Sequence, residues 1–167
     1  MRTAAFLILS ILASAQTSGV WLDVPFVAQP EDGCGAASIA MILQYWTGGP
    51  PADVAAITRS LVSREAHGIY ASDLERYLRQ QGYRTFALRG EWSDLEEQLG
   101  RGRPLIVALQ PGKGALHYVV LTGLDPSSDA VVKNDPAVRK ALKQHRREFL
   151  DQWKAAGYWT LLALPSQ

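Results

Sequence analysis

The residue with the most reactive side chain is Cys34, the only cysteine among 167 residues. It lies between Gly33 and Gly35, where a stretch with apolar residues at helical spacing begins. Unpaired backbone amides and the positive end of the helix dipole at such a position stabilise a thiolate. One interpretation of Cys34 is therefore a nucleophile, and the other is a small buried core residue.

A cysteine nucleophile needs a base, and the base needs a group that orients it. The sequence offers three histidines. His145 lies in a charged stretch with a helical pattern and is expected at the surface. His67 precedes a glycine in a predicted loop and is expected to be a surface or a turn residue. His117 begins an apolar strand and is the candidate base. Its alternative is a hydrogen-bonded core histidine.

Two further residues complete the candidate site. Asp135 follows the next predicted strand, and the ends of adjacent strands in a hairpin come together, so it is the candidate carboxylate for orienting His117. Its alternative role is that of a turn or helix-cap residue. Gln29 precedes Cys34 by five positions and is a candidate oxyanion donor together with the Cys34 backbone N–H, although taken alone it is an ordinary loop residue.

No metal or other cofactor is expected. One cysteine and three scattered histidines do not have the spacing of metal ligands, and thiol acyl transfer needs none.

Helical patterns dominate the first half of the chain. The stretch from Cys34 is stopped by the Gly and Pro residues at 48–51, and a second helix is predicted over 52–63. Two Ser-x-x-Glu sequences, at 72–75 and 93–96, are typical of capping boxes and predict helices ending at Gly82 and near Gly100.

Strand patterns dominate the second half. Strands are predicted at 83–88, 104–109, 116–124, 130–133 and 158–164, after an extended segment at 20–27. One long helix is predicted over 138–156. Because tight turns join the later strands, the fold class is α+β, with N-terminal helices packed on a C-terminal, largely antiparallel sheet.

The N-terminus has the pattern of a secretory signal peptide. Arg2 precedes the apolar run 4–13, and Ala13-Ser14-Ala15 is typical of a cleavage site. We therefore expect residues 1–15 to be a signal peptide and 16–167 to be one exported domain, periplasmic or extracellular, with no stable membrane insertion after cleavage. The alternative is an uncleaved anchor. A lone cysteine in an exported protein is a free thiol, which favours the reactive interpretation of Cys34.

Composition narrows the range of partners. Hydrophobic residues make up 47% of the chain, enough for a core, and the formal net charge is +1. The one basic cluster, 140–147, has Glu148 and Asp151 beside it and is predicted to be a solvated helical face. A nucleic-acid or anionic-membrane surface is therefore not expected.

Four motifs together resemble those of a known family. Gln29-x4-Cys34-Gly35 with the following helix is similar to the nucleophile motif of C39 peptidases and the wider C39-like group. The stretch 117–123, His-Tyr-Val-Val-Leu-Thr-Gly, resembles the family's histidine motif. Asn134-Asp135-Pro136 resembles its aspartate motif, and Phe149-x3-Trp153 its C-terminal helix. The resemblance covers nearly all of the chain after residue 15.

The resemblance implies a papain-like fold and a Cys/His/Asp site whose roles fall on Cys34, His117, Asp135 and Gln29. The function it implies is an exported cysteine peptidase acting on peptide or related amide bonds in a peptide or protein substrate. The best-known members cut double-glycine leaders as domains of bacterial peptide exporters. Two alternatives stay open: an idle papain-like peptide-binding module, and a transpeptidase or amidase acting on cell-wall or isopeptide substrates. The sequence predicts neither the substrate nor the oligomeric state.

Overall fold

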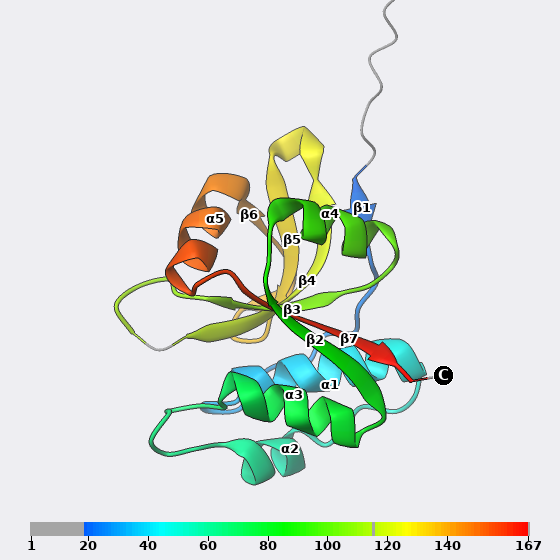
Figure 1. The fold of residues 1–167 in the computed structure, drawn as a ribbon, viewed down its shortest axis with the longest axis vertical. Coiled ribbons are helices and arrows are strands. Elements are labelled where there is room, and N and C mark those ends of the chain that lie inside the picture. The colour runs from blue at the N-terminus through cyan, green and yellow to red at the C-terminus, as the bar shows by residue number, and fades with distance from the viewer. Residues whose placement is uncertain (1–18, 115, 167) are drawn as a thin grey trace, which may run out of the picture.

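A single antiparallel sheet organises the chain. The computed structural model describes residues 19–114 and 116–166, which form a seven-stranded sheet in the order β2-β7-β3-β4-β5-β6, with β1 paired to β4 (Figure 1). All of these pairings are antiparallel. The strands are β1 (Val20–Trp21), β2 (Tyr83–Arg89), β3 (Leu105–Leu109), β4 (His117–Asp125), β5 (Ala130–Asp135), β6 (Arg139–His145) and β7 (Trp159–Pro165).

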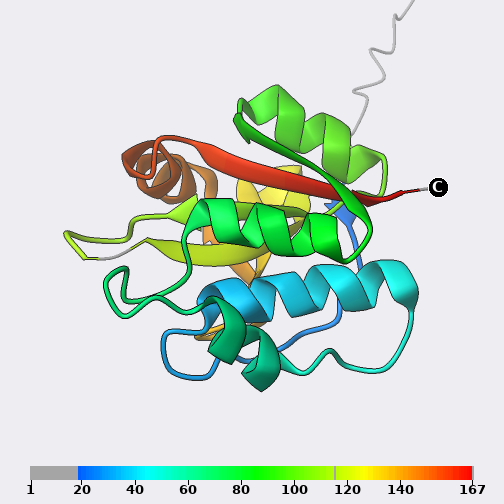
Figure 2. The same ribbon diagram turned by 60° about the horizontal axis from the view of Figure 1, so that its bottom comes forward.

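Helices cover both faces of the sheet. They are α1 (Cys34–Thr47), α2 (Val54–Leu61), α3 (Ala71–Gln80), α4 (Trp92–Gly100) and α5 (Arg146–Ala155). In Figures 1 and 2, α1, α2 and α3 gather on one side, and α4 and α5 lie on the other. The predicted α+β class, with N-terminal helices on an antiparallel sheet, is confirmed.

The alternation of side chains along β4 divides the core in two. Tyr118 and Val120 pack in the cluster that includes α1, α2 and α3, while Val119 and Leu121 pack in the cluster that includes α4 and α5. With both faces covered, β3 and the central part of β4 are buried throughout. The ends of β4 are therefore held by apolar packing on two sides.

Helix α1 is the most deeply packed helix of the described chain. All eight residues from Gly35 to Ile42 are buried. The preceding turn is tight: the Gly33 N–H donates to the Pro30 carbonyl at 3.0 Å, and a Cβ on Gly33 would lie 2.6 Å from Pro30 Cδ. A glycine is therefore required immediately before Cys34. The position of Cys34 is set by this turn before it and by the buried residues of α1 after it.

The predicted helix over 138–156 is wrong in its first half. Residues 139–145 form strand β6 on the edge of the sheet, and α5 begins at Arg146. Asn134 Oδ1 accepts a hydrogen bond from the Ala141 N–H at 2.9 Å, and Ala141 has a positive φ of 51°, which no α-helix allows. Pairing with β5 therefore outweighs the local helical preference. Strand β5, predicted to end at 133, continues to Asp135.

Both predicted capping boxes are also wrong. Helix α3 begins at Ala71 with Tyr70 at its N-cap and no side-chain cap. Helix α4 begins at Trp92 and has a capping box formed by Glu91 and Asp94 rather than by the Ser93 sequence. Helix α2 is shorter than predicted, and its cap is Asp53, whose carboxylate accepts from the Ala56 N–H at 3.0 Å.

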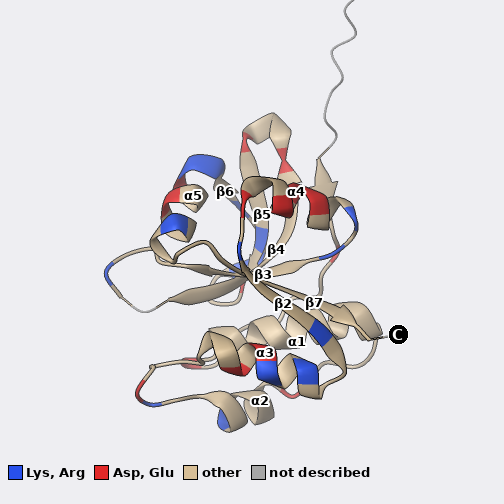
Figure 3. Cartoon of the chain, viewed as in Figure 1, with Lys and Arg blue, Asp and Glu red and all other residues tan. Residues whose placement is uncertain are grey.

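The charged residues do not form the helical face predicted for 140–147. That segment is divided between β6 and the start of α5. Its Lys140 pairs with Asp23 and its Lys143 with Asp125, both at 2.6 Å. Figure 3 shows residues of both signs on α3 and on α5.

The predicted signal peptide, residues 1–15, lies outside the described residues. Within the described ranges, none of the helices has the length and apolar character needed to span a bilayer.

Trp153 provides a test of the α5 packing. It is 1% exposed, stacks against Phe149 with ring centroids 5.4 Å apart, and meets Tyr158 edge to face at 5.2 Å. Replacing it with Ala should lower the free energy of unfolding by about 3–5 kcal/mol, because the cavity left in the core cannot close fully. Urea denaturation followed by circular dichroism measures this change.

The matched control is Trp21→Ala, since Trp21 is 55% exposed. It should change the free energy of unfolding by only about 0.5 kcal/mol. Equal losses for the two tryptophan variants would contradict the packing described for α5.

Candidate active site

Cys34 is the first residue of α1, and its free thiol is half-buried. Gly33 at the N-cap has no side chain, so none caps this end of the helix. Cys34 lines a hollow of about 350 Å³ together with Ile69, Tyr70, Leu116 and Tyr118 among others. The thiol therefore meets open space beside a mostly apolar wall, at the helix end whose dipole stabilises a thiolate.

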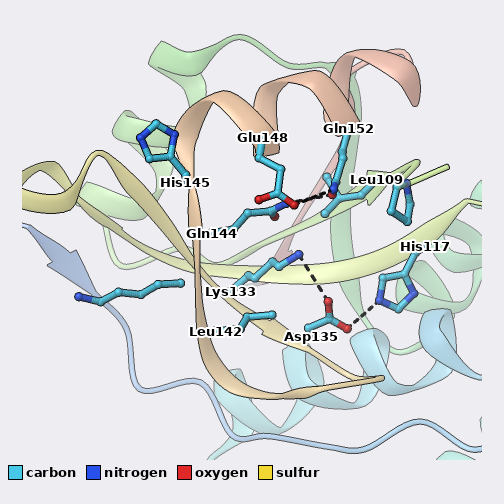
Figure 4. Close-up of a pocket in the computed structure, with 11 residues that line it drawn as sticks. Leu109, His117, Lys133, Asp135, Leu142, Gln144, His145, Glu148 and Gln152 are labelled. Atoms are coloured by element: carbon cyan, nitrogen blue, oxygen red, sulfur yellow. Dashed lines mark hydrogen bonds and ion pairs between the residues drawn. The ribbon is translucent and has the colours of Figure 1, made fainter.

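His117 and Asp135 lie together as the hairpin geometry predicts. His117 is the first residue of β4 and Asp135 the last of β5, and His117 Nε2 is 2.8 Å from Asp135 Oδ1 (Figure 4). Because Nε2 faces the carboxylate, Nδ1 is the ring nitrogen left for Cys34. His117 is thus hydrogen-bonded, and 22% of its side chain is exposed.

The imidazole of His117 interacts with both Asp135 and Cys34. Burial lowers the pKa of His117, but hydrogen bonds with Asp135 and Cys34, and the negative charge on each, outweigh it and raise the pKa to about 9. The geometry therefore favours an imidazolium that persists well above neutral pH, next to a thiol at a helix N-terminus.

The carboxylate of Asp135 is held on both oxygens. Oδ1 also accepts from the Ala137 N–H at 3.1 Å, and Oδ2 lies 3.4 Å from Lys133 Nζ. Burial raises the pKa of Asp135, but the contacts with His117, Lys133 and Ala137 outweigh it and hold the pKa below its ordinary value. Asp135 is therefore ionised when it faces His117.

Sequence reasoning missed Lys133. Its side chain is 5% exposed, and burial lowers its pKa while the Asp135 charge opposes that shift. The available signal was a lysine inside an apolar strand, two positions before Asp135 and hence on the same face. A buried ammonium requires a partner, and Asp135 is that partner.

Sequence reasoning also missed the role of Asn134. Its buried Nδ2 donates to the Val24 carbonyl at 3.0 Å, and its Oδ1 holds the β5–β6 turn through Ala141. The Gln29 N–H in turn donates to the Pro136 carbonyl at 3.0 Å. The loop that carries Gln29 is therefore anchored to the turn that carries Asp135. Gln29 Oε1 is buried without a partner among the described residues.

The other two histidines each line a hollow at the site: His67 the one beside Cys34, and His145 one that borders His117 and Asp135. His67 is an exposed turn residue with a positive φ of 47°, and His145 is exposed at the end of β6. The surface prediction is confirmed for both, although the helical setting predicted for His145 is wrong. Among the described residues, no three His, Cys, Asp or Glu side chains group together as a metal site.

Comparison with known proteins identifies the family. The family model described as "Peptidase_C39 like family" matches residues 21–161, which include all four candidate residues. The chain belongs to this family. It is therefore a C39-like member of the cysteine peptidases, and the prediction of that enzyme class is confirmed.

Among solved structures, the C39-like chain is similar to a putative C39-like peptidase from Bacillus anthracis, with a TM-score of 0.70 and 21% identity over 90% of this chain and 99% of that one. A double glycine motif protease from an AMS/PCAT transporter, solved with the leader peptide, has a TM-score of 0.69 and 25% identity over 88% and 95%. These similarities confirm the fold of C39 peptidase domains.

A curated relative is the Transport/processing ATP-binding protein ComA of Streptococcus pneumoniae, which is 32% identical over 136 residues. The match covers 80% of this chain and 17% of ComA. The C39-like chain thus spans about a sixth of the length of that relative.

The titration of His117 tests the site geometry. Asp135→Asn removes the carboxylate charge that favours the imidazolium, so the pKa of His117 should fall from about 9 toward its ordinary value. The measurement is an NMR titration of the His117 ring protons between pH 5 and 11 in both proteins. Asp129→Asn, which changes a carboxylate that contacts His145 and Arg146 instead, is the control and should leave the His117 titration in place. An unchanged titration in Asp135→Asn would rule out the coupling.

Proposed function

We propose that the chain hydrolyses peptide bonds with Cys34 as nucleophile, His117 as general acid and base, and Asp135 as the group that orients His117. The observation that supports this best is the 2.8 Å contact between His117 and Asp135 beside a thiol at the start of α1. A nucleophile, a base and an orienting carboxylate in contact is the arrangement that thiol acyl transfer requires.

In acylation, His117 holds the Cys34 proton as an imidazolium, and the thiolate attacks the carbonyl carbon of the scissile bond. The carbon–nitrogen bond breaks as His117 returns the proton to the leaving amine, and a thioester with Cys34 remains. Water, deprotonated by His117, then attacks the thioester and releases the acid. Asp135 stays ionised throughout, holding the imidazole in one tautomer and stabilising its charged form.

Gln29 is the proposed oxyanion donor together with the Cys34 backbone N–H. Two features support this role. The Gln29 loop is anchored to the Asp135 turn through Pro136, and the Cys34 N–H belongs to the first turn of α1, where amides lack intrahelical acceptors. A donor at this position is worth about 10²–10³ in kcat.

The proposed substrates are peptides or proteins. One relative was solved with a leader peptide and another carries the name of a processing protein, which supports a peptide ligand in the cleft. Because the chain spans only 17% of ComA, transport and leader specificity do not follow for it. The wall of Ile69, Leu116 and Tyr118 beside Cys34 favours apolar or small residues on the acyl side of the bond.

The reactivity of Cys34 tests the proposal. The alkylation rate with iodoacetamide should be high well below pH 8, and His117→Ala should slow it or move it to higher pH, because the imidazolium that stabilises the thiolate is lost. The same proteins are then given a peptide library, and products are identified by mass spectrometry. Wild type should cleave peptides, and Cys34→Ala and His117→Ala should not.

Gln29→Ala serves as the matched variant in this experiment. It should alkylate like wild type but lose about 10²–10³ in kcat/KM, because only the oxyanion is affected. A Cys34 that labels only in denaturant, with no peptide cleaved, would instead favour an idle binding module. Transfer of the acyl group to added amines faster than to water would favour a transpeptidase.

We further propose that the chain is exported and cleaved after Ala15, on the basis of the apolar run 4–13 and the Ala13-Ser14-Ala15 sequence. Expression of the full chain in a bacterium, followed by fractionation and N-terminal mass spectrometry, should find a product beginning at Gln16 outside the cytosol. Ala13→Lys, which places a charge in the cleavage sequence, should leave the precursor uncut. A cytosolic full-length product from the unaltered sequence would overturn this proposal.

A further inference from the structure

A second hollow, of about 370 Å³, lies on the α5 side of His117 and Asp135 (Figure 4). Its walls come from the β3–β4 connection, β5, β6 and α5, and they include His117, Lys133, Gln144, Glu148 and Gln152. Cys34 lines the other hollow instead. The volume of the hollow on the α5 side falls in the lower part of the range of roughly 300–1,000 Å³ typical of ligand pockets.

Three side chains on one wall form a directed chain of hydrogen bonds. Gln152 Nε2 donates to Glu148 Oε1 at 3.1 Å, and Gln144 Nε2 donates to Gln152 Oε1 at 3.0 Å. A carboxylate only accepts, so the direction of the chain is set by Glu148. It ends at Gln144 Oε1, an acceptor that is buried without a partner among the described residues. Gln144 as a whole is 8% exposed.

The neighbouring strand β5 supplies a donor. Lys133 Nζ lies 3.4 Å from Asp135 Oδ2, and an ammonium carries three N–H groups. Lys133 therefore has donors beyond the one that Asp135 takes, and its side chain lines the hollow. The lining of the hollow thus includes both a side chain whose acceptor lacks a partner, Gln144, and a partly used donor, Lys133.

The charges around the hollow largely cancel. Lys133 pairs with Asp135, and Lys143 pairs with Asp125 outside the hollow. Glu148 is the remaining carboxylate of the lining, and its charge is opposite to that of the His117 imidazolium. A charged ligand group would lose its hydration here without gaining an unpaired opposite charge. A neutral group with one donor and one acceptor would instead form hydrogen bonds with both Gln144 and Lys133. A carboxamide is such a group.

We propose that this hollow binds the carboxamide side chain of a Gln or Asn residue on the leaving-group side of the scissile bond. This rests on the proposed function. Cys34 keeps the acyl part of the substrate, and His117 protonates the leaving amine, so the leaving group lies on the His117 side. The carboxamide oxygen accepts from Lys133 Nζ, and its NH₂ donates to Gln144 Oε1.

The experiment compares peptides that differ in one residue. A peptide cleaved by the full chain is resynthesised with Gln, Asn, Leu, Glu or Lys at each of the three positions after the cleaved bond. At one position, wild type should prefer Gln or Asn over Leu by about tenfold in kcat/KM, as expected for two hydrogen bonds of ordinary strength. In Gln144→Met, which has a similar length but no acceptor, this ratio should fall to about one.

Two further variants make the result specific. Gln110→Met makes the same chemical change in a side chain that bonds Gly114 and is not in the lining, so it should keep the ratio. Gln144→Glu should move the preference from Gln to Lys, because it adds a negative charge to the free acceptor. Circular dichroism confirms that each variant is folded.

A binding measurement separates this proposal from the proposed function. Calorimetry measures the affinity of Cys34→Ala for the Gln and Leu forms of the peptide. If wild type cleaves no peptide, the Gln and Leu forms of one fixed library pool are used instead. Selective binding of the Gln form without cleavage by wild type would contradict the proposed peptidase activity and support carboxamide binding in the hollow. Cleavage without a Gln or Asn preference, or a preference that survives Gln144→Met, would overturn the proposed carboxamide binding. So would the absence of both cleavage and selective binding.

Discussion

The site depends on a negative charge carried by Asp135 into a largely enclosed position. An ionised carboxylate in such a place is tolerated only when its oxygens are paired. Here His117 and the Ala137 N–H take one oxygen and Lys133 lies beside the other. Together with Cys34, the same carboxylate raises the pKa of His117 to about 9, so the pairing that stabilises Asp135 also prepares the base.

The packing of the sheet determines where that charge meets the thiol. Helix α1 packs on the face of β4 that carries Tyr118 and Val120, while His117 begins the same strand. The first residue of α1 and the first residue of β4 thereby lie at one edge of the molecule. Asn134 adds a second constraint, because it binds both the Val24 carbonyl and the β5–β6 turn. The Gln29 loop and the Asp135 turn are thus tied together by the Asn134 side chain and by the hydrogen bond from the Gln29 N–H to the Pro136 carbonyl.

The chain has the fold of C39 peptidase domains, and the two sides of its candidate site differ in character. On the Cys34 side the wall is mainly apolar, and on the α5 side it is polar and carries a buried lysine. A bond placed between Cys34 and His117 would have a different environment on each side. Such an asymmetry is what a peptidase needs to distinguish the acyl part of a substrate from its leaving group.

Local patterns in the sequence were sufficient for the parts of the site that depend on position along one element. A cysteine at a helix start, a histidine at a strand start and an aspartate after the next strand predicted the residues that the fold brings together, and their motifs predicted the family. The order of helical and strand patterns, with tight turns between the later strands, likewise predicted the α+β class.

Tertiary structure decided the features that depend on partners far away in the chain. Residues 139–145 have a helical composition but form β6, because β5 and Asn134 supply hydrogen bonds that no local pattern records. In the sequence, Lys133 is an ordinary strand residue, and only the fold pairs it with Asp135. Likewise, the orientation of the Gln144 amide depends on its hydrogen bond to Gln152, which in turn donates to Glu148. Periodicity is encoded by near neighbours and can be read from the sequence, whereas the pairing of buried polar groups is decided when distant segments pack.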